Sequence, residues 1–329
     1  MDADIDWKIA LVQIPASSHD VLGDENPYLV TKAKFLSRNI PVQEFTDESL
    51  TKPSHQRPYV LGGLSLQIFA KLGGLPWLLE TSGAPCHEIV LGIGSAQIGT
   101  GRFGDRERVV GLTTAFSGDG TYWLTEASRT VPYNEHESAI GESVVAAVAR
   151  IRKRMAWRSG DPVRLVFHSF KQFRGAHVSR IRELVEDLKR DGYDVRCAFV
   201  HIAEDHPIEV FDTAHPKRVA PRGLAVHLDD REILLSMLGP GDLRRDYVGF
   251  PGPLLLKLHR DSDFRDLDYL ARQVLAFSAH SWRNFGPTSL PVTIQYSELI
   301  AGLLGRLGNL SKWDPDILRG EVGQARWFL

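Results

Sequence analysis

The alternation of apolar and polar residues predicts three consecutive strands in the first half of the chain. The stretch HEIVLGIGSAQIGTGRFGDRERVVGLTTAFSGDGTYWL, residues 87–124, contains apolar runs rich in β-branched residues at 89–93 and 109–116. The turn Gly118-Asp119-Gly120 leads into a third apolar run at 122–124. We therefore predict three consecutive strands that form a meander.

Before the meander, the pattern predicts a small α/β unit that ends near Cys86. WKIALVQIP has the apolar run of a buried strand, and Leu29, Ala33 and Leu36 fall at helical spacing before a short second strand. A second helix is predicted over 64–72, where two glycines and a proline follow it.

After the meander, helices and strands alternate. Apolar residues recur every three or four positions over 140–155, and Asn134 and Glu137 have the spacing of a capping box at the start of this helix. VRLVFHS and VRCAFVHI read as strands around a helix whose apolar face is Val178, Ile181, Leu184 and Leu188. This order is typical of an RNase H-like domain. We therefore predict an α/β protein with a small unit over 1–86 and an RNase H-like domain over 87–329.

Composition adds few constraints. The 329 residues are 43% hydrophobic and 24% charged, as in a globular protein. The formal net charge is −2, so any site that binds a polyanion must be a local cluster of basic residues. The two cysteines, Cys86 and Cys197, form no CxxC pair, and the acidic start MDADID lacks the basic residues of a signal peptide. No apolar run approaches the roughly 18 residues of a membrane span. We expect a cytoplasmic protein.

Four side chains of the small unit suit a terminal phosphate. Tyr28 and Lys32 share a helix face, Gln43 lies on the next strand, and Lys71 is near the end of the second helix. Two ammonium groups supply charge, an amide and a phenol supply hydrogen bonds, and the ring can stack. The alternative is that both lysines are merely solvated.

Longer motifs support the phosphate interpretation. NPYLVTKAKFLSRNIPVQEF and IFAKLGGLPW resemble the MID domain of prokaryotic Argonaute proteins, and SLPVTIQYSELIAGLL and WDPDILRGEVGQARWFL resemble the end of their PIWI domain. The resemblance implies a Rossmann-like MID unit and a short, PAZ-lacking Argonaute. Since the chain opens on the first MID strand, whether this unit is complete stays open.

The resemblance also implies a ligand for the small unit. The family's phosphate-binding residues map onto Tyr28, Lys32, Gln43 and Lys71, which would anchor the 5′ phosphate of a guide strand. Gln43 and the terminal carboxylate of Leu329 would hold Mg²⁺ or Mn²⁺ at that phosphate. The ending WFL also reads as an apolar tail in a core, which is compatible with this role.

The same resemblance predicts that the PIWI domain does not cut. Cutting members hold two metal ions about 4 Å apart with carboxylates, and the first of these positions is Gly94 here. Counting from His168, the second falls on Phe170, while Glu298 replaces the family's fourth ligand. We therefore expect no catalytic residues and a sheet that serves as a platform for a paired guide and target.

Other motifs leave alternatives open. HIAEDHP offers His201, Glu204, Asp205 and His206 as metal ligands or as loop charges, and GIGSAQIG resembles a dinucleotide loop without its GxGxxG spacing. RIRKRMAWR, residues 150–158, suits either phosphates or a solvated helix face. Arg283 and Tyr296 lie in segments that face the guide backbone in the family. For the tryptophans we expect core or interface positions: Trp157, Trp282 and Trp313.

Together these features predict a protein that anchors a 5′-phosphorylated guide RNA and recognises complementary DNA or RNA without cleaving it. The resemblance implies a separately encoded effector with an APAZ-like region, such as a TIR or sirtuin-type enzyme or a nuclease, in prokaryotic defence against plasmids or phages. One rival is an active nuclease with Asp105, Asp119 and Glu298 as replacement ligands. The other is a scaffold protein that binds no guide.

Overall fold

The protein is described from a computed structural model. It describes residues 6–17, 21, 23–81, 87–98, 108–128, 131–243, 250–314, 317–318 and 320–329. Cys86 and Asp105 lie outside these ranges.

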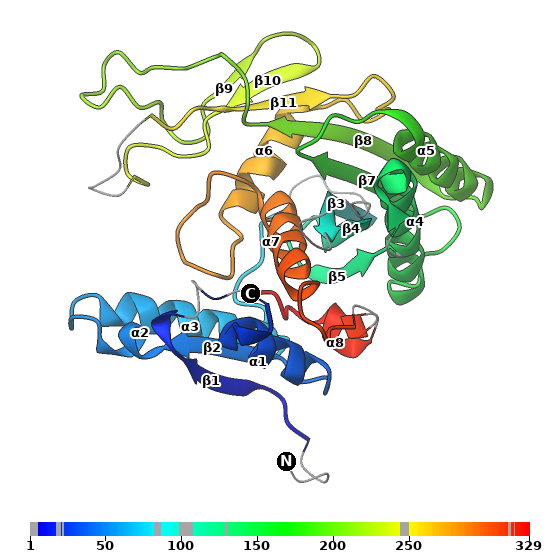
Figure 1. Ribbon diagram of the computed structural model, residues 1–329. Helices are drawn as coiled ribbons and strands as arrows, with labels where there is room; N and C mark the ends of the chain where they lie inside the picture. Colours follow the sequence, from blue (N-terminus) through cyan, green and yellow to red (C-terminus); the bar gives the residue numbers. More distant parts are fainter. Residues whose placement is uncertain are drawn as a thin grey trace.

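A small α/β unit lies below the main body in Figure 1. Strands β1 (Ala10–Ile14) and β2 (Val42–Thr46) pair in parallel. A 3₁₀ turn, η2 (Gly23–Glu25), and helix α1 (Pro27–Leu36) connect them. Helices α2 (Asp47–Thr51) and α3 (Arg57–Lys71) follow.

The main body is built on one nine-stranded sheet. Along its main path the strand order is β5-β4-β3-β7-β8-β11-β10-β9, and β6 pairs with β4. The antiparallel meander comprises β3 (His87–Ile98), β4 (Arg108–Ser117) and β5 (Tyr122–Ala127), as predicted. The remaining strands are β6 (Val131–Pro132), β7 (Pro162–Ser169), β8 (Asp194–Ala203), β9 (Ala225–His227), β10 (Glu232–Leu235) and β11 (Leu254–Leu258).

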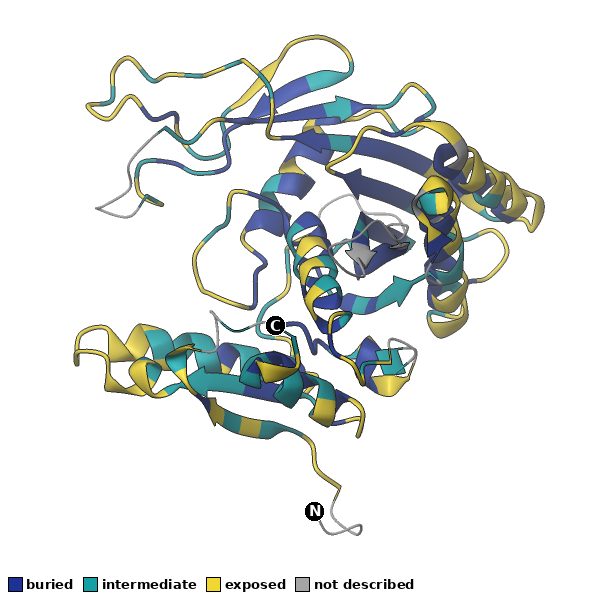
Figure 2. Ribbon diagram, viewed as in Figure 1, coloured by how far each residue is buried: buried dark blue, intermediate teal, exposed yellow. Residues whose placement is uncertain are grey.

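Helices cover both faces of this sheet. One face packs against α4 (His136–Arg154), which follows the 3₁₀ turn η3 (Tyr133–Glu135), and against α5 (Gly175–Arg190). The other packs against α6 (Leu267–Ser278), α7 (Val292–Leu307) and the C-terminal segment with α8 (Glu321–Gln324). Figure 2 shows the central strands buried between these layers.

Strand alternation divides the core between the two faces. Ile89 and Leu91 of β3 point toward α4 and α5, whereas Val90 belongs to the cluster with α6 and α7. The pairing of β3 with β7 and of β7 with β8 is parallel, so these three strands end at the same edge. Near that edge, Gly94 of β3 packs against Ser297 of α7.

Two local predictions differ from the structure. Helix α3 begins at Arg57, seven residues before the predicted start, because its first two turns expose most of their residues and give no apolar period. The capping box is wrong: Asn134 belongs to η3, and the N-cap of α4 is Glu135, whose side chain makes no cap bond. Within the described ranges, no helix combines the length and apolarity needed to cross a membrane.

Candidate nucleic-acid interface

Helix α1 presents the first two residues of the predicted phosphate site. The Asn26 side chain caps the helix, which fixes where its first turn begins. Tyr28 and Lys32, four residues apart, lie on one face, and Nζ of Lys32 is 5.1 Å from the centre of the Tyr28 ring. Arg306 of α7 approaches the same ring from the main body, with Cζ 5.8 Å from its centre.

Strand β2 joins these residues to the other two. Lys71, the last residue of α3, donates from Nζ to the Val42 carbonyl at 2.8 Å and to Oε1 of Gln43 at 2.7 Å. The next residue, Glu44, lies with Oε2 3.3 Å from Nζ of Lys32. The structure therefore brings Tyr28, Lys32, Gln43 and Lys71 into one cluster, although nothing here tests what the cluster binds.

Three members of the cluster are buried, and Tyr28 is partly buried. Lys32 has no exposed surface, and Gln43 and Lys71 expose 6% and 3%. Burial, and then the nearby charge of Lys32, holds the pKa of Lys71 well below its usual range, while the charge of Glu44 acts in the opposite direction. Buried cations at such short range favour the binding of an anion that compensates them.

The C-terminal segment runs into this cluster, and Figure 1 shows the end of the chain between the small unit and the main body. Nζ of Lys32 donates to the Trp327 carbonyl at 3.4 Å. Trp327, Phe328 and Leu329 expose 5% or less. The segment is thus the apolar core tail that its sequence suggested. The role of the Leu329 carboxylate as a metal ligand stays a prediction.

Arg326 ties the same segment to both units. Its Nη1 donates to the Ala70 carbonyl of α3 at 2.9 Å, and its guanidinium lies 4.4 Å from the centre of the Trp282 ring. Burial lowers the pKa of Arg326, and its charge is compensated only by ring faces and a carbonyl dipole in these contacts.

A polar groove of about 710 Å³ opens between α3 and α7. Arg283 lines it with an exposed side chain, while its backbone carbonyl accepts a bond from Nε2 of Gln67 at 3.5 Å. Arg306 lines the same groove and also faces Tyr28. The phosphates of a nucleic-acid backbone in this groove would lie near the positive charges of two arginines, beside the lysine cluster.

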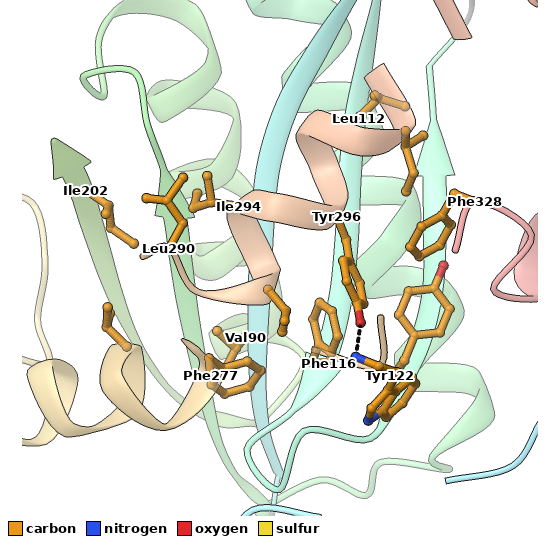
Figure 3. Close-up of a cluster of buried hydrophobic side chains, with 14 of the residues drawn as sticks. Val90, Leu112, Phe116, Tyr122, Ile202, Phe277, Leu290, Ile294, Tyr296 and Phe328 are labelled. Atoms are coloured by element: carbon orange, nitrogen blue, oxygen red, sulfur yellow. Dashed lines mark hydrogen bonds between the residues drawn. The ribbon is translucent and has the colours of Figure 1, made fainter. Parts of the chain in front are cut away.

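Tyr296 occupies a different environment from Arg283. It has no exposed surface and packs in the cluster of Figure 3, where its ring centre lies 5.1 Å from that of Phe328. Its hydroxyl accepts a bond from the backbone N–H of Trp282 at 2.9 Å, and burial raises the pKa of Tyr296 to about 12. In this structure it supports the segment before Arg283, and its contact with a guide backbone stays a prediction.

Helix α7 fills the space above Gly94. A Cβ on Gly94 would lie 3.0 Å from Cβ of Ser297, and a Cβ on Gly92 would lie only 2.0 Å from the Thr293 carbonyl oxygen. Oγ1 of Thr114 on β4 contacts Oγ of Ser297 at 3.0 Å and helps to fix the helix there. An aspartate at position 94 would therefore compete with α7 for this space.

A cleft of about 490 Å³ lies at the shared edge of β3, β7 and β8. Phe170 lines it, 37% exposed, with Nζ of Lys171 5.5 Å from its ring centre. Arg174 and His177 line the same cleft. The cleft is thus lined by a phenyl ring, by basic side chains and by the acidic residues Glu137, Glu204 and Asp205.

Asp119, one of the acidic residues proposed as replacement ligands, lies far from this cleft. Asp119 lies in the β4–β5 turn, where its side chain accepts bonds from Ser117 and Thr121. Ser117 pairs with Ile89, five residues along β3 from Gly94, on the order of 17 Å away. Asp105 lies outside the described residues.

Glu298 has one acidic neighbour. Burial, and then the charge of Glu204, raises the pKa of Glu298. Throughout the part of the chain that the structure describes, no three His, Cys, Asp or Glu side chains are placed to hold a metal ion. Within HIAEDHP, Nε2 of His201 contacts the Phe170 carbonyl at 3.1 Å and Nε2 of His206 contacts the Pro253 carbonyl at 2.8 Å.

The remaining motifs have structural roles. Residues 92–98 belong to β3, so the dinucleotide loop is wrong. Of the basic run at 150–158, Arg150 pairs with Glu126 and Arg152 with Asp191, which is the behaviour of a solvated helix face. The tryptophan predictions are confirmed: Trp157 and Trp282 are buried, and Trp313 is partly buried.

Comparison with known proteins decides the family. A model of the Piwi domain matches residues 9–309. The chain belongs to the Argonaute and Piwi family. The protein argonaute of Cereibacter sphaeroides is 36% identical over 321 residues, which are 93% of this chain and 41% of that protein. The Piwi protein of Archaeoglobus fulgidus is 25% identical over 327 residues, 94% of this chain and 74% of that protein.

Solved structures of the family confirm the predicted fold class. Clostridium butyricum Argonaute, bound to a guide DNA and a 19-mer target DNA, matches with a TM-score of 0.70 and 18% identity over 92% of this chain and 38% of that chain. Drosophila Piwi matches with a TM-score of 0.71 and 15% identity, over 98% and 42%. The mixed α/β fold is that of the MID–PIWI portion of Argonaute structures. The chain thus spans about two fifths of the argonaute and of these structures.

Sequence reasoning missed three charged residues of this MID–PIWI interface. Glu44 follows Gln43 directly, Arg306 lies in the last turn of α7, and Arg326 precedes the apolar tail. Each looks like a surface charge in the sequence, because only the packing of β2 against α1, of α7 and of the C-terminal segment brings these residues to the cluster. The one available signal was the position of Glu44 inside a predicted strand beside a proposed ligand.

Proposed function

We propose that this Piwi-family chain anchors the 5′ phosphate of a guide RNA and presents the guide for pairing with complementary DNA, without cutting either strand. The observation that carries the proposal is the cluster of buried Lys32, Lys71 and Gln43 with the partly buried Tyr28, beside an arginine-lined groove. Buried ammonium groups bind a phosphate with little competition from water, which strengthens each charge-assisted bond.

The proposal that neither strand is cut rests on the edge of the main sheet where β3, β7 and β8 end. Position 94 has no side chain, a Cβ there would lie only 3.0 Å from Cβ of Ser297, and Phe170 cannot bind a metal ion. Two-metal hydrolysis needs both ions to hold the attacking and leaving oxygens. A PIWI sheet without these carboxylates serves as a binding platform.

The oxygen atoms that these residues offer are of the type that a divalent cation binds. Mg²⁺ and Mn²⁺ take oxygen ligands, and the Gln43 amide and the Leu329 carboxylate would hold the ion. When bound, it would supply positive charge between guide phosphates. The proposal also extends, on the resemblance alone, to a separately encoded effector in defence against plasmids or phages, for which co-purification with the products of neighbouring genes is the test.

Guide binding is tested with a short RNA that carries either a 5′ phosphate or a 5′ hydroxyl. We expect the phosphate to tighten binding by about 2 to 4 kcal/mol, the scale of two charge-assisted bonds. Lys32→Met/Lys71→Met should remove that gain, since methionine fills the same space without charge. Fluorescence anisotropy in Mg²⁺, followed by a cleavage assay on a paired target, measures both parts of the proposal.

The matched control is Lys34→Met/Lys52→Met, which removes two exposed lysines of the same unit. This variant should keep the full preference for the 5′ phosphate. Equal binding of both RNA ends by the unmodified protein would sink the guide-anchor proposal and favour the scaffold alternative. Metal-dependent cutting of the target would instead support the nuclease alternative.

A further inference from the structure

A carboxylate occupies the proposed phosphate site. Oε2 of Glu44 lies 3.3 Å from Nζ of Lys32, and its side chain exposes only 4% of its surface. Oε1 is also buried and accepts no hydrogen bond from any residue that the structure describes. A buried carboxylate with an unpaired oxygen is costly, so its position calls for an explanation beyond packing.

Glu44 acts on both lysines of the cluster. It pairs with Lys32 directly, and its charge opposes the lowering of the Lys71 pKa by Lys32. Without Glu44, two ammonium groups would stand close together in the core with only carbonyl and amide oxygens as acceptors. The carboxylate therefore takes the place that an external anion would have.

An incoming phosphate must compete with this internal anion. A terminal phosphate carries a charge of about −1.5 to −2 near pH 7, whereas a carboxylate carries one negative charge. At the short distance between Lys32 and Glu44, a phosphate and the carboxylate would repel each other strongly in this poorly hydrated site. Glu44 and the phosphate therefore cannot both stay in close contact with Lys32.

Resting on the proposed function, we propose that Glu44 is a built-in counter-anion of the guide-free site, that a terminal phosphomonoester replaces it at Lys32, and that Glu44 thereby sets the affinity for the 5′ end. Anions with a single charge gain little by the exchange, because they only substitute one negative charge for another. The site thus favours phosphomonoesters over phosphodiesters.

The test removes the charge of Glu44 and keeps its shape. Glu44→Gln should bind a 5′-phosphorylated RNA roughly 10- to 100-fold more tightly than the unmodified protein in EDTA, the factor that corresponds to one charge-assisted bond. Binding of the 5′-hydroxyl RNA should not change. The control Asp47→Asn removes an equal charge from an exposed position three residues away and should leave both affinities unchanged.

Thermal unfolding provides a second test, which still applies if Glu44→Gln folds poorly. Glu44→Gln leaves Lys32 buried without its carboxylate, so we expect a lower thermal midpoint than that of the unmodified protein. Inorganic phosphate should raise this midpoint more in Glu44→Gln than in the unmodified protein. In a Lys32→Met background, Glu44→Gln should produce no gain in phosphate binding.

The outcomes separate this inference from the function on which it rests. If the unmodified protein prefers the 5′ phosphate and Glu44→Gln adds nothing, Glu44 is not a competing anion and the inference is wrong. If Glu44→Gln weakens binding, the carboxylate itself helps to hold the guide, which also overturns it. If the unmodified protein ignores the 5′ phosphate, the guide-anchor proposal fails first, and the response to inorganic phosphate still decides the role of Glu44.

Discussion

At the scale of single residues, His168 couples the PIWI core to pH. It has no exposed surface, its Nδ1 lies 2.9 Å from Oγ1 of Thr293, and burial lowers its pKa to about 3. The pKa in the folded protein is thus below the value of about 6.5 in an unfolded chain. The neutral ring contributes its full stability above pH 6.5, and this contribution is lost as the pH falls toward 3.

We therefore expect His168 alone to account for about 2 kcal/mol of the stability lost between pH 6.5 and pH 5, at about 1.4 kcal/mol per pH unit. Urea unfolding at both pH values measures it. His168→Gln should lack this part of the loss, whereas the exposed His55→Gln should behave like the unmodified protein. An identical loss in all three proteins would assign the acid sensitivity to other groups.

Residue identities in the phosphate cluster could be predicted from the sequence, but their environment could not. Tyr28, Lys32, Gln43 and Lys71 were identified because a family motif fixes their types and spacing. The environment of Lys32 includes both Glu44 and a carbonyl contributed 295 residues later. No local pattern contains that information.

At the scale of elements, the close contact between α7 and β3 requires a glycine at position 92. Gly92→Ala would place a methyl group 2.0 Å from a backbone oxygen of α7, so helix or strand must move. We expect a loss of unfolding free energy of roughly 1 to 3 kcal/mol or more, as for an overpacked core. Gly302→Ala is the matched control, because its Cβ meets nothing within 4 Å and alanine favours the helix by about 1 kcal/mol. Urea denaturation compares the two, and equal effects would mean that α7 can shift freely.

Elements with strong periodicity were predicted well and those without it were not. The three meander strands and α5 follow from alternating or helical apolar positions. The start of α3 was missed because few of its first residues are buried, and no pattern marked the two glycines of β3 as a helix contact.

At the scale of the whole molecule, Arg326 joins the small unit, the main body and the C-terminal segment. Arg326→Met would leave the Ala70 carbonyl without this donor and remove the charge that faces Trp282. We expect a loss of roughly 2 kcal/mol in stability, together with weaker binding of the 5′-phosphorylated RNA. Arg272→Met, at an exposed position on α6, should change neither quantity. Thermal unfolding and anisotropy measure the two effects, and a stable variant with normal binding would contradict this role.

The order of the two units was predictable from the order of helices and strands. The path of the last residues was not, since an apolar tail can pack against any exposed apolar face. Only the whole fold shows that it lies between the two units, beside the lysine cluster.

The hydrogen bond between Lys32 and the Trp327 carbonyl can form only after the ribosome has synthesised both residues. These residues are 295 positions apart, and at about 5 to 20 residues per second the ribosome needs on the order of 15 to 60 s to travel from one to the other. During this interval Lys32 can meet Glu44, which follows soon after it, but not the carbonyl that completes its environment. The environment of Lys32 is therefore incomplete in the nascent chain until the segment that contains Trp327 has been synthesised.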